Sequence, residues 1–502
     1  MDELMNESTT TETTTEEVEV KEQPVVKEQT AVKEQPAARQ PRPERRRKTK
    51  EELFKENTLP FIILGVAAIL ILTFIIGSIV RGVQKKKMEI AASSAAAESL
   101  VAEDSRLNEE MANILAEAAR LAAGYDYDGA IALIDTFSGN IGAYPELQDA
   151  RVNYEYSKGA LLAWEDPNSI MNLSFQTLVA DASRAFSDEA YGDSMEKNFV
   201  TIAEFEKILQ QLYENDYVLV GLKDIVTSVT DENGKTTYAY KELYLPEGKK
   251  PFVLTQTNVN YNLYLVDRNE DMVPDKEGVG IASKMVLLDD GSITCEMVDA
   301  NGNTVTGAYD LVPILDQFVA DHPDFSYHGA KAVLALTGYN GLFGYRTHAA
   351  GREKFGEDAY QKDVAAVQAL ADALKNSGYE LACYTYGNSP YGGFALSEIQ
   401  ADMQLWVDEV TPILGNVDVI VFAQESDINN GMLLSGEKYD YLKSVGFNYF
   451  LGFCAEGDSF TFISEDYVRQ GRMLVNGFNM TQNPAWFNGI FDTESLLDTI
   501  RG

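Results

Sequence analysis

The sequence predicts an α/β protein with parallel strands, carried on a helical spacer behind one membrane-spanning helix. From residue 312 onward, short apolar segments alternate with amphipathic helical segments, a pattern typical of a parallel sheet with crossover helices. The segment 249–261, KKPFVLTQTNVNY, contains an apolar stretch that ends in polar residues, as in a buried strand opening into a binding site. An uncharged apolar run at 60–80 has the length of about 20 residues that crosses a bilayer.

The N-terminal segment 1–58 is predicted to be a disordered cytoplasmic tail. It is rich in Thr and Glu, repeats VKEQ at 20–23, 26–29 and 32–35, and holds little apolar material to bury. We expect a transmembrane helix at 59–82, because the tail and the apolar run are both too long for a cleaved signal peptide. Basic residues are more numerous on its N-terminal side, which favours a single-pass cell-membrane protein with a cytoplasmic N-terminus and an extracytoplasmic large domain.

A helical spacer is predicted at 83–165. Apolar residues from Leu100 to Leu121 recur at steps of three and four, which indicates one helix over 88–123. The spacing of Gly124, Tyr127 and Ala130 is similar to that of a tetratricopeptide repeat, and a third helix is expected at 145–164. A coiled coil and a repeat module both remain open, and a packed spacer is favoured over a peptide-binding groove.

Composition excludes some functions for the remainder, 166–502. The formal net charge is −37 and the tail is nearly neutral, so the acidity lies in the C-terminal part and argues against nucleic acid as a partner. The three cysteines are far apart and predict neither a disulfide framework nor a zinc site. The acidic loop 267–278 fails as an EF-hand, because Met272 replaces the turn glycine and Gly278 the closing glutamate.

The elements of 166–502 follow from local signals. Thr201 and Glu204 form a capping box that opens a helix, Asn233-Gly234 indicates a hairpin turn, and 285–307 is predicted to be an inserted β-meander. Helices are expected at 312–321, 360–377, 396–411 and 436–445, and strands at 332–336, 381–383, 417–422, 449–454 and 473–478.

The stretch 245–262, LPEGKKPFVLTQTNVNYN, resembles the start of the catalytic domain in membrane-anchored polysaccharide deacetylases of the NodB-homology type, which reads roughly LPxGKxPxVLSQDDVNYY. The resemblance implies an incomplete or distorted (β/α) barrel over about 166–480, and a metal site made by one of two adjacent aspartates and two histidines. Thr257 and Asn258 stand where the aspartates belong, and Tyr384 and Asn388 where the histidines of an HSxGH-like motif belong.

Two further family histidines correspond to Asn172 and Gln176. The replacements are neutral at pH 7 and lack the thiolate, imidazole and carboxylate donors that zinc prefers. We therefore expect no metal, no cofactor and no catalytic residue at these degenerate positions. Of the histidines His322, His328 and His348, only His348 lies near a predicted strand-end loop.

What remains at the predicted barrel mouth is polar and aromatic, chemistry that suits sugar rings and hydroxyls. The ligand-binding candidates are Gln256, Asn258, Tyr345, Arg346, Tyr384 and Asn388. The leading hypothesis is a catalytically inactive deacetylase-like protein that binds a cell-envelope glycan or a partner protein. The alternatives are an active metal-dependent N-deacetylase with a relocated site, using Glu425 or Asp427, and a structural or assembly factor acting through the helical spacer.

Overall fold

The computed structural model describes residues 95–429 and 431–501, with side chains from residue 102 onward. These residues all belong to one compact unit of the chain. The predicted tail, 1–58, and the predicted transmembrane helix, 59–82, lie outside the described residues. Within the described ranges, no helix is both long and apolar enough to cross a membrane.

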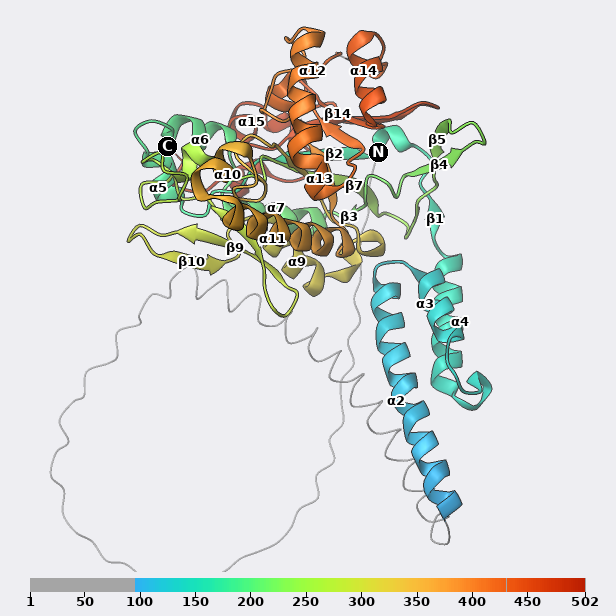
Figure 1. The fold of residues 1–502 in the computed structure, drawn as a ribbon. Helices are drawn as coiled ribbons and strands as arrows, with labels where there is room; N and C mark the ends of the chain where they lie inside the picture. Colours follow the sequence, from blue (N-terminus) through green and yellow to red (C-terminus); the bar gives the residue numbers. More distant parts are fainter. Residues whose placement is uncertain (1–94, 430, 502) are drawn as a thin grey trace, which may run out of the picture. The chain divides into compact units, whose positions relative to one another are not determined.

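Seven parallel strands close into a barrel in the order β7, β11, β12, β13, β14, β16, β2 and back to β7. They are β2 (Met171–Phe175), β7 (Lys250–Thr257), β11 (Val333–Leu336), β12 (Glu380–Cys383), β13 (Val419–Val421), β14 (Tyr449–Phe453) and β16 (Val468–Leu474). Strands β2, β7 and β14 are labelled in Figure 1. Strand β3 (Tyr217–Leu219) pairs with the start of β7, and β15 (Phe460–Ile463) runs antiparallel to β16. The expectation of an α/β fold with a parallel sheet is confirmed, and the sheet is closed.

Helices cover the outside of the barrel. They are α7 (Ile202–Glu214), α9 (Leu311–Asp321), α11 (Glu357–Asn376), α12 (Leu396–Leu405) and α14 (Glu437–Val445). The predicted capping box opens α7: the Glu204 backbone N–H donates to Thr201 Oγ1, and the Thr201 N–H donates to the Glu204 carboxylate at 2.8 Å. Helix α11 buries Val367, Leu370 and Leu374 against the sheet, as its helical spacing predicts.

The strands alternate between two environments. Outward residues such as Leu254, Leu334 and Ile420 pack in the apolar layer that includes the helices, whereas inward residues such as Val253 and Val419 form a second cluster within the barrel. Strands β2, β7 and β16 place polar side chains at inward positions: Asn172, Ser174, Thr255, Thr257, Gln470 and Arg472. The barrel interior is therefore polar on the side formed by β2, β7 and β16 and apolar elsewhere.

Two predicted boundaries are wrong. The last strand is 468–474 instead of 473–478, because its inward residues are Gln470 and Arg472 and the segment lacks an apolar pattern. Asn476 then caps α15 (Gly477–Gln482) by accepting the Asn479 N–H at 2.8 Å. The helix predicted at 145–164 ends at residue 159, and 162–163 form the short strand β1, which pairs with β6 (Tyr244–Leu245).

Smaller elements surround the barrel. The β-meander is present as β8 (Lys284–Leu287), β9 (Ile293–Val298) and β10 (Thr304–Gly307), and the predicted hairpin is β4 (Val226–Thr230) with β5 (Thr236–Tyr240). Short helices α5 (Ala182–Ser187), α6 (Gly192–Asn198), α8 (Leu263–Val266), α10 (Ala349–Phe355), α13 (Thr411–Leu414) and α16 (Thr493–Leu496) complete the described part.

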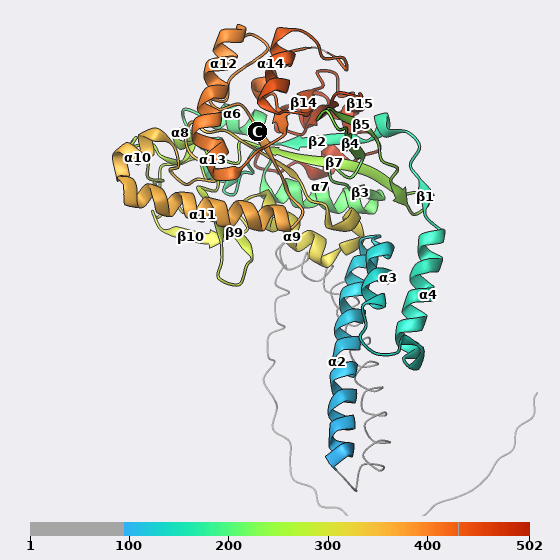
Figure 2. The same cartoon turned by 45° about the vertical axis from the view of Figure 1, so that its right-hand side comes forward.

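The spacer is a packed set of three helices, α2 (Ala95–Ala123), α3 (Tyr127–Asp135) and α4 (Pro145–Gly159) (Figure 2). The apolar stripe of α2, including Met111, Ile114 and Ala118, packs in one cluster with residues of α3 and α4. The apolar stripe of α2 is therefore buried against α3 and α4 of the same chain. The helices also touch the barrel, because the His328 N–H donates to the Gly124 carbonyl oxygen at 2.8 Å.

Candidate functional site

The carboxyl ends of the barrel strands meet at one mouth, where parallel barrels place their binding residues. Thr257 and Asn258 end β7, and Tyr384 follows β12 directly. The Tyr384 phenol accepts the Gln424 backbone N–H at 3.3 Å and forms a hydrogen bond with the Thr257 side chain. Asn388 joins the group through its carbonyl oxygen, which accepts from Gln424 Nε2 at 2.7 Å. The structure thus brings all four degenerate positions to one place.

Asn258 and Gln176 are direct partners. Asn258 Nδ2 donates to Gln176 Oε1 at 3.0 Å, so two positions where the resembling family has acidic and histidine side chains are joined by an amide–amide hydrogen bond. The side-chain oxygens Oδ1 of Asn258 and Asn388 are buried without a partner among the described residues. A buried oxygen of this kind is where a bound water or ligand hydroxyl is expected.

The backbone of the mouth is strained. Five of the twelve non-glycine residues with positive φ in the described part lie here: Asn258 (60°), Thr385 (58°), Asn388 (56°), Gln424 (52°) and Glu425 (54°). Such conformations cost about 1 to 3 kcal/mol each and gather at ligand-binding and active sites. Five positive-φ residues from three separate loops therefore gather at the mouth, an observation that does not depend on any resemblance.

Arg472 supplies the positive charge of the mouth. It is only 1% exposed, and its guanidinium donates to Ser174 Oγ at 2.8 Å, to the Gly452 carbonyl oxygen at 2.9 Å and to the Phe422 carbonyl oxygen at 3.1 Å. All three acceptors are neutral, and no ion pair forms with Arg472 among the described residues. Burial lowers the pKa of Arg472, and the nearby groups of Tyr384, Asp427 and Glu425 act in the opposite direction.

The residues of the mouth do not fit the metal ion that the deacetylase family implies. Burial raises the pKa of Tyr384, although Arg472 lowers it, and the phenol is a poor ligand and a poor base when protonated. Thr257, Asn258 and Asn388 add no negative charge, and Arg472 adds a fixed positive one. No group of three or more His, Cys, Asp or Glu side chains that could hold a metal ion occurs within 95–429 and 431–501.

Three sequence candidates lie away from this group. Gln256 points outward from β7, where its Nε2 donates to Asp310 Oδ1 at 2.6 Å in a buried network with Tyr261. Tyr345 packs beside the meander with the Lys284 ammonium 5.1 Å from its ring centroid, and burial raises its pKa to about 12. Arg346 lies in the loop between β11 and α10, where its backbone N–H donates to Asp363 Oδ2 at 2.9 Å.

The histidines have structural surroundings. The His322 ring contacts Tyr213 and Phe318 in tilted arrangements, at ring centroid distances of 4.4 and 4.7 Å, and His328 stacks on Tyr327 at 3.9 Å. His348 is buried beside Arg346, and burial together with the Arg346 charge lowers its pKa to about 4. His348 is therefore neutral at pH 7, as a metal ligand must be, but the positive charge of the adjacent Arg346 opposes the binding of a metal ion.

The two carboxylates considered for a relocated site differ in availability. Asp427 is enclosed and forms an ion pair with Arg469 at 2.6 Å, so its charge is already matched. Glu425 is exposed, follows β13 on a left-handed backbone, and influences the pKa of both Tyr384 and Arg472. Of the two, only Glu425 is free to act on a ligand.

Sequence reasoning missed Arg472 and Ser174. Ser174 alternates with the apolar residues Leu173 and Phe175 in NLSF, and this spacing of two was an available signal. The segment RQGRML shows no such alternation around Arg472. Strand β16 was not recognised from the sequence, because the inward Arg472 interrupts the apolar pattern by which strands are identified.

No protein-family model and no curated protein matches this chain. Among solved structures, a deacetylase from Streptococcus pyogenes, PplD, in complex with acetate, is similar to it with a TM-score of 0.33 and 11% sequence identity. The match covers 64% of this chain and 97% of that chain. A similarity with this TM-score carries no argument about the fold or the chemistry of this chain.

Proposed function

We propose that this chain is a membrane-anchored, deacetylase-like protein that binds a cell-envelope glycan at the barrel mouth without hydrolysing it. The observation that carries this proposal is the set of groups at the strand ends. They are hydrogen-bonding amides and a phenol on strained backbone, beside the buried cation Arg472. Such groups suit sugar hydroxyls, whereas amide hydrolysis at a metal needs anionic or imidazole ligands and a base.

The membrane anchor in this proposal rests on the apolar run 60–80 and its basic flanks. It accounts for an envelope location and for an extracytoplasmic barrel. The glycan is supported by the resemblance of 245–262 and by the chemistry of the mouth. A partner protein at the same mouth is the competing ligand, and binding to purified glycan distinguishes the two.

The direct test is calorimetric titration of the detergent-solubilised full chain with N-acetylglucosamine oligomers, alongside an acetate-release assay with added zinc. We expect binding in the micromolar to millimolar range, and no acetate release. Tyr384→Phe, which removes only the phenol oxygen, should weaken binding several-fold, because a lost hydrogen bond costs roughly 0.5–1.5 kcal/mol. The matched control is Tyr156→Phe on α4, where the ring is 80% exposed.

A second candidate function is hydrolysis with Glu425 as the general base. Its exposed carboxylate and its electrostatic effect on Tyr384 favour this candidate over Asp427, which is already paired with Arg469. Metal-dependent acetate release that disappears in Glu425→Gln would replace the binding proposal with this one. If Tyr384→Phe binds the oligomer as tightly as wild type does, the glycan-binding site must lie away from the barrel mouth.

A further inference from the structure

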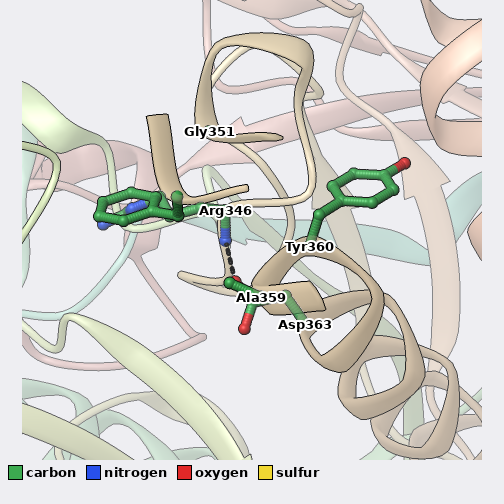
Figure 3. A pocket seen from close by; sticks show the side chains of 6 residues that line it. Arg346, Gly351, Ala359, Tyr360 and Asp363 are labelled. Carbon is green, nitrogen blue, oxygen red and sulfur yellow. Dashed lines mark hydrogen bonds between the residues drawn. The ribbon is translucent and has the colours of Figure 1, made fainter. Parts of the chain in front are cut away.

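A small cavity lies on the barrel rim, apart from the group around Tyr384 (Figure 3). Its volume is about 230 Å³, and it is lined by Arg346, Gly351, Phe355, Ala359, Tyr360 and Asp363. The loop that leaves β11, helix α10 and the first turns of α11 build it. Helical spacing explains the walls, because Gly351 and Phe355 are four residues apart on α10, and Ala359 and Asp363 are four apart on α11.

Two aromatic side chains supply the apolar part of the cavity wall. Phe355 is 40% exposed. Tyr360 is half-buried, and the Arg352 guanidinium lies 4.9 Å from its ring centroid. Ring edges and faces of this kind are the usual partners of the C–H surface of a sugar.

The polar part of the wall consists of Asp363 and Arg346, whose side-chain charges are opposite in sign and do not form an ion pair with each other within the described residues. Asp363 Oδ2 accepts the Arg346 backbone N–H at 2.9 Å (Figure 3), while its Oδ1 has no hydrogen-bond partner within the described residues. The Arg346 side chain is 7% exposed and is held by the carbonyl oxygens of Met272 at 3.1 Å and Asn340 at 3.2 Å. Its burial lowers its pKa to about 10, so the guanidinium stays charged at pH 7.

Three consecutive residues at this rim have unsatisfied polar atoms. Arg346 Nη2, Thr347 Oγ1 and His348 Nδ1 are all buried with no partner in the described part of the chain. Each buried unsatisfied group costs about 1–3 kcal/mol, and native proteins keep few of them without a bound water or ligand. Of the three residues only Arg346 lines the cavity, so its Nη2 is the unsatisfied donor that a bound water or ligand there would satisfy.

We propose that the cavity binds a single sugar ring, which is a second contact of the glycan whose binding to the mouth is proposed above. The volume corresponds to roughly eight waters at about 30 Å³ each, and it lies below the 300–1,000 Å³ or so of drug-sized pockets. One pyranose ring fits such a space and a longer segment does not. Asp363 Oδ1 accepts ring hydroxyls, and the opposite charges of Asp363 and Arg346 favour a ring without net charge.

The test uses the detergent-solubilised full chain and N-acetylglucosamine as the probe, followed by saturation-transfer NMR and titration. Ala359→Leu fills the cavity and should reduce monosaccharide affinity at least tenfold. Asp363→Asn keeps the oxygen that accepts the Arg346 N–H but removes the charge, and should reduce affinity several-fold. The matched control is Ala365→Leu on an exposed position of α11, which should bind as the wild type does.

The outcomes separate this inference from the proposed function. Equal monosaccharide binding by Ala359→Leu and wild type overturns the cavity site, as does a wild type that binds the oligomer but no monosaccharide. Monosaccharide binding that is lost in Ala359→Leu and kept in Tyr384→Phe supports it. If the oligomer binds no better than the monosaccharide, the glycan proposal for the mouth fails while the cavity site stands.

Discussion

Glu380, which is partly buried, and Arg472, which is fully buried, lie near opposite ends of the barrel strands, and neither forms an ion pair within the described residues. Glu380 opens β12. Its Oε1 accepts the Lys223 backbone N–H at 3.2 Å, and its Oε2 is enclosed without a partner. The pKa of Glu380 is raised from 4.5 to about 7, mainly by burial and also by Asp224 and Asp418, against the lowering effect of Lys223.

This shift predicts a pH dependence of stability. Between pH 4.5 and about 7 the folded protein keeps a proton on Glu380 that the unfolded chain has released, so stability falls as the pH rises through this window. Glu380→Gln should therefore be more stable than wild type at pH 8, by about 1 to 3 kcal/mol at about 1.4 kcal/mol per pKa unit, and nearly equal to it at pH 4.5. Urea unfolding of both proteins at the two pH values measures the difference.

The control for this prediction is Glu247→Gln, an exposed turn residue whose change should leave the pH profile as it is. A Glu380→Gln variant whose advantage is the same at pH 4.5 and pH 8 would contradict the titration argument. In that case the gain would come from packing instead of the lost charge.

At the residue scale, the residues that form the barrel mouth could be predicted from the sequence, but the buried positive charge beside them could not. Thr257, Asn258, Tyr384 and Asn388 meet there because each follows a strand whose apolar pattern is easy to recognise. Gln256 was assigned to the same surface from its neighbours, but alternate strand residues face opposite sides, and it points outward. Arg472 could not be placed, because its strand has no apolar pattern.

At the element scale, the strands with continuous apolar runs were predictable and the polar ones were not. Strands β11, β12 and β14 agree with prediction to within about a residue at each end, because both of their faces are buried. Strand β16 was misplaced by several residues, because its inward side chains bond to other polar groups inside the barrel. Only the closed barrel brings Asn172 and Ser174 of β2 to Gln470 and Arg472 of β16.

The contact between the three-helix spacer and the barrel is an element-scale feature that can be tested. A Cβ atom at Gly124 would lie 3.1 Å from the Ser326 carbonyl oxygen and 3.5 Å from the His328 nitrogen. Gly124→Leu should therefore weaken this contact, and hydrogen exchange should become faster at 124–130 and 324–329. The Tyr125 hydroxyl, which donates to the Asp324 carbonyl oxygen at 2.7 Å, should lose this bond.

Gly159→Leu is the matched control, because a Cβ atom there meets nothing within 4 Å. Identical exchange in the two variants would mean that the helices and barrel are not held by this contact. The same two variants, Gly124→Leu and Gly159→Leu, also test the alternative that the chain is an assembly factor acting through its helical spacer. A Gly124→Leu protein that binds glycan normally but no longer functions in cells would support an action through the spacer.

For the whole molecule, the charge of Arg472 bears on whether the barrel can hold a metal. Restoring the acidic and imidazole ligands through Thr257→Asp, Asn258→Asp, Tyr384→His and Asn388→His gives the mouth the donors that zinc prefers. Arg472 remains fixed beside them by three hydrogen bonds. Two unit charges about 4 Å apart repel by about 4 kcal/mol at an effective dielectric of 20, so a guanidinium there should weaken zinc binding by orders of magnitude.

We therefore expect the fourfold variant to hold no tightly bound zinc, and the same variant with Arg472→Met to bind about one zinc per chain. Elemental analysis after dialysis, with circular dichroism to verify folding, measures both. Arg472→Met alone is the control and should bind none, because the mouth then has neither the cation nor the ligands. Tight zinc binding in the fourfold variant with Arg472 in place would show that this guanidinium does not govern the mouth. Failure of the fivefold variant, while it remains folded, would show that the strained turns at Asn258 and Asn388 hold the new side chains away from a common centre.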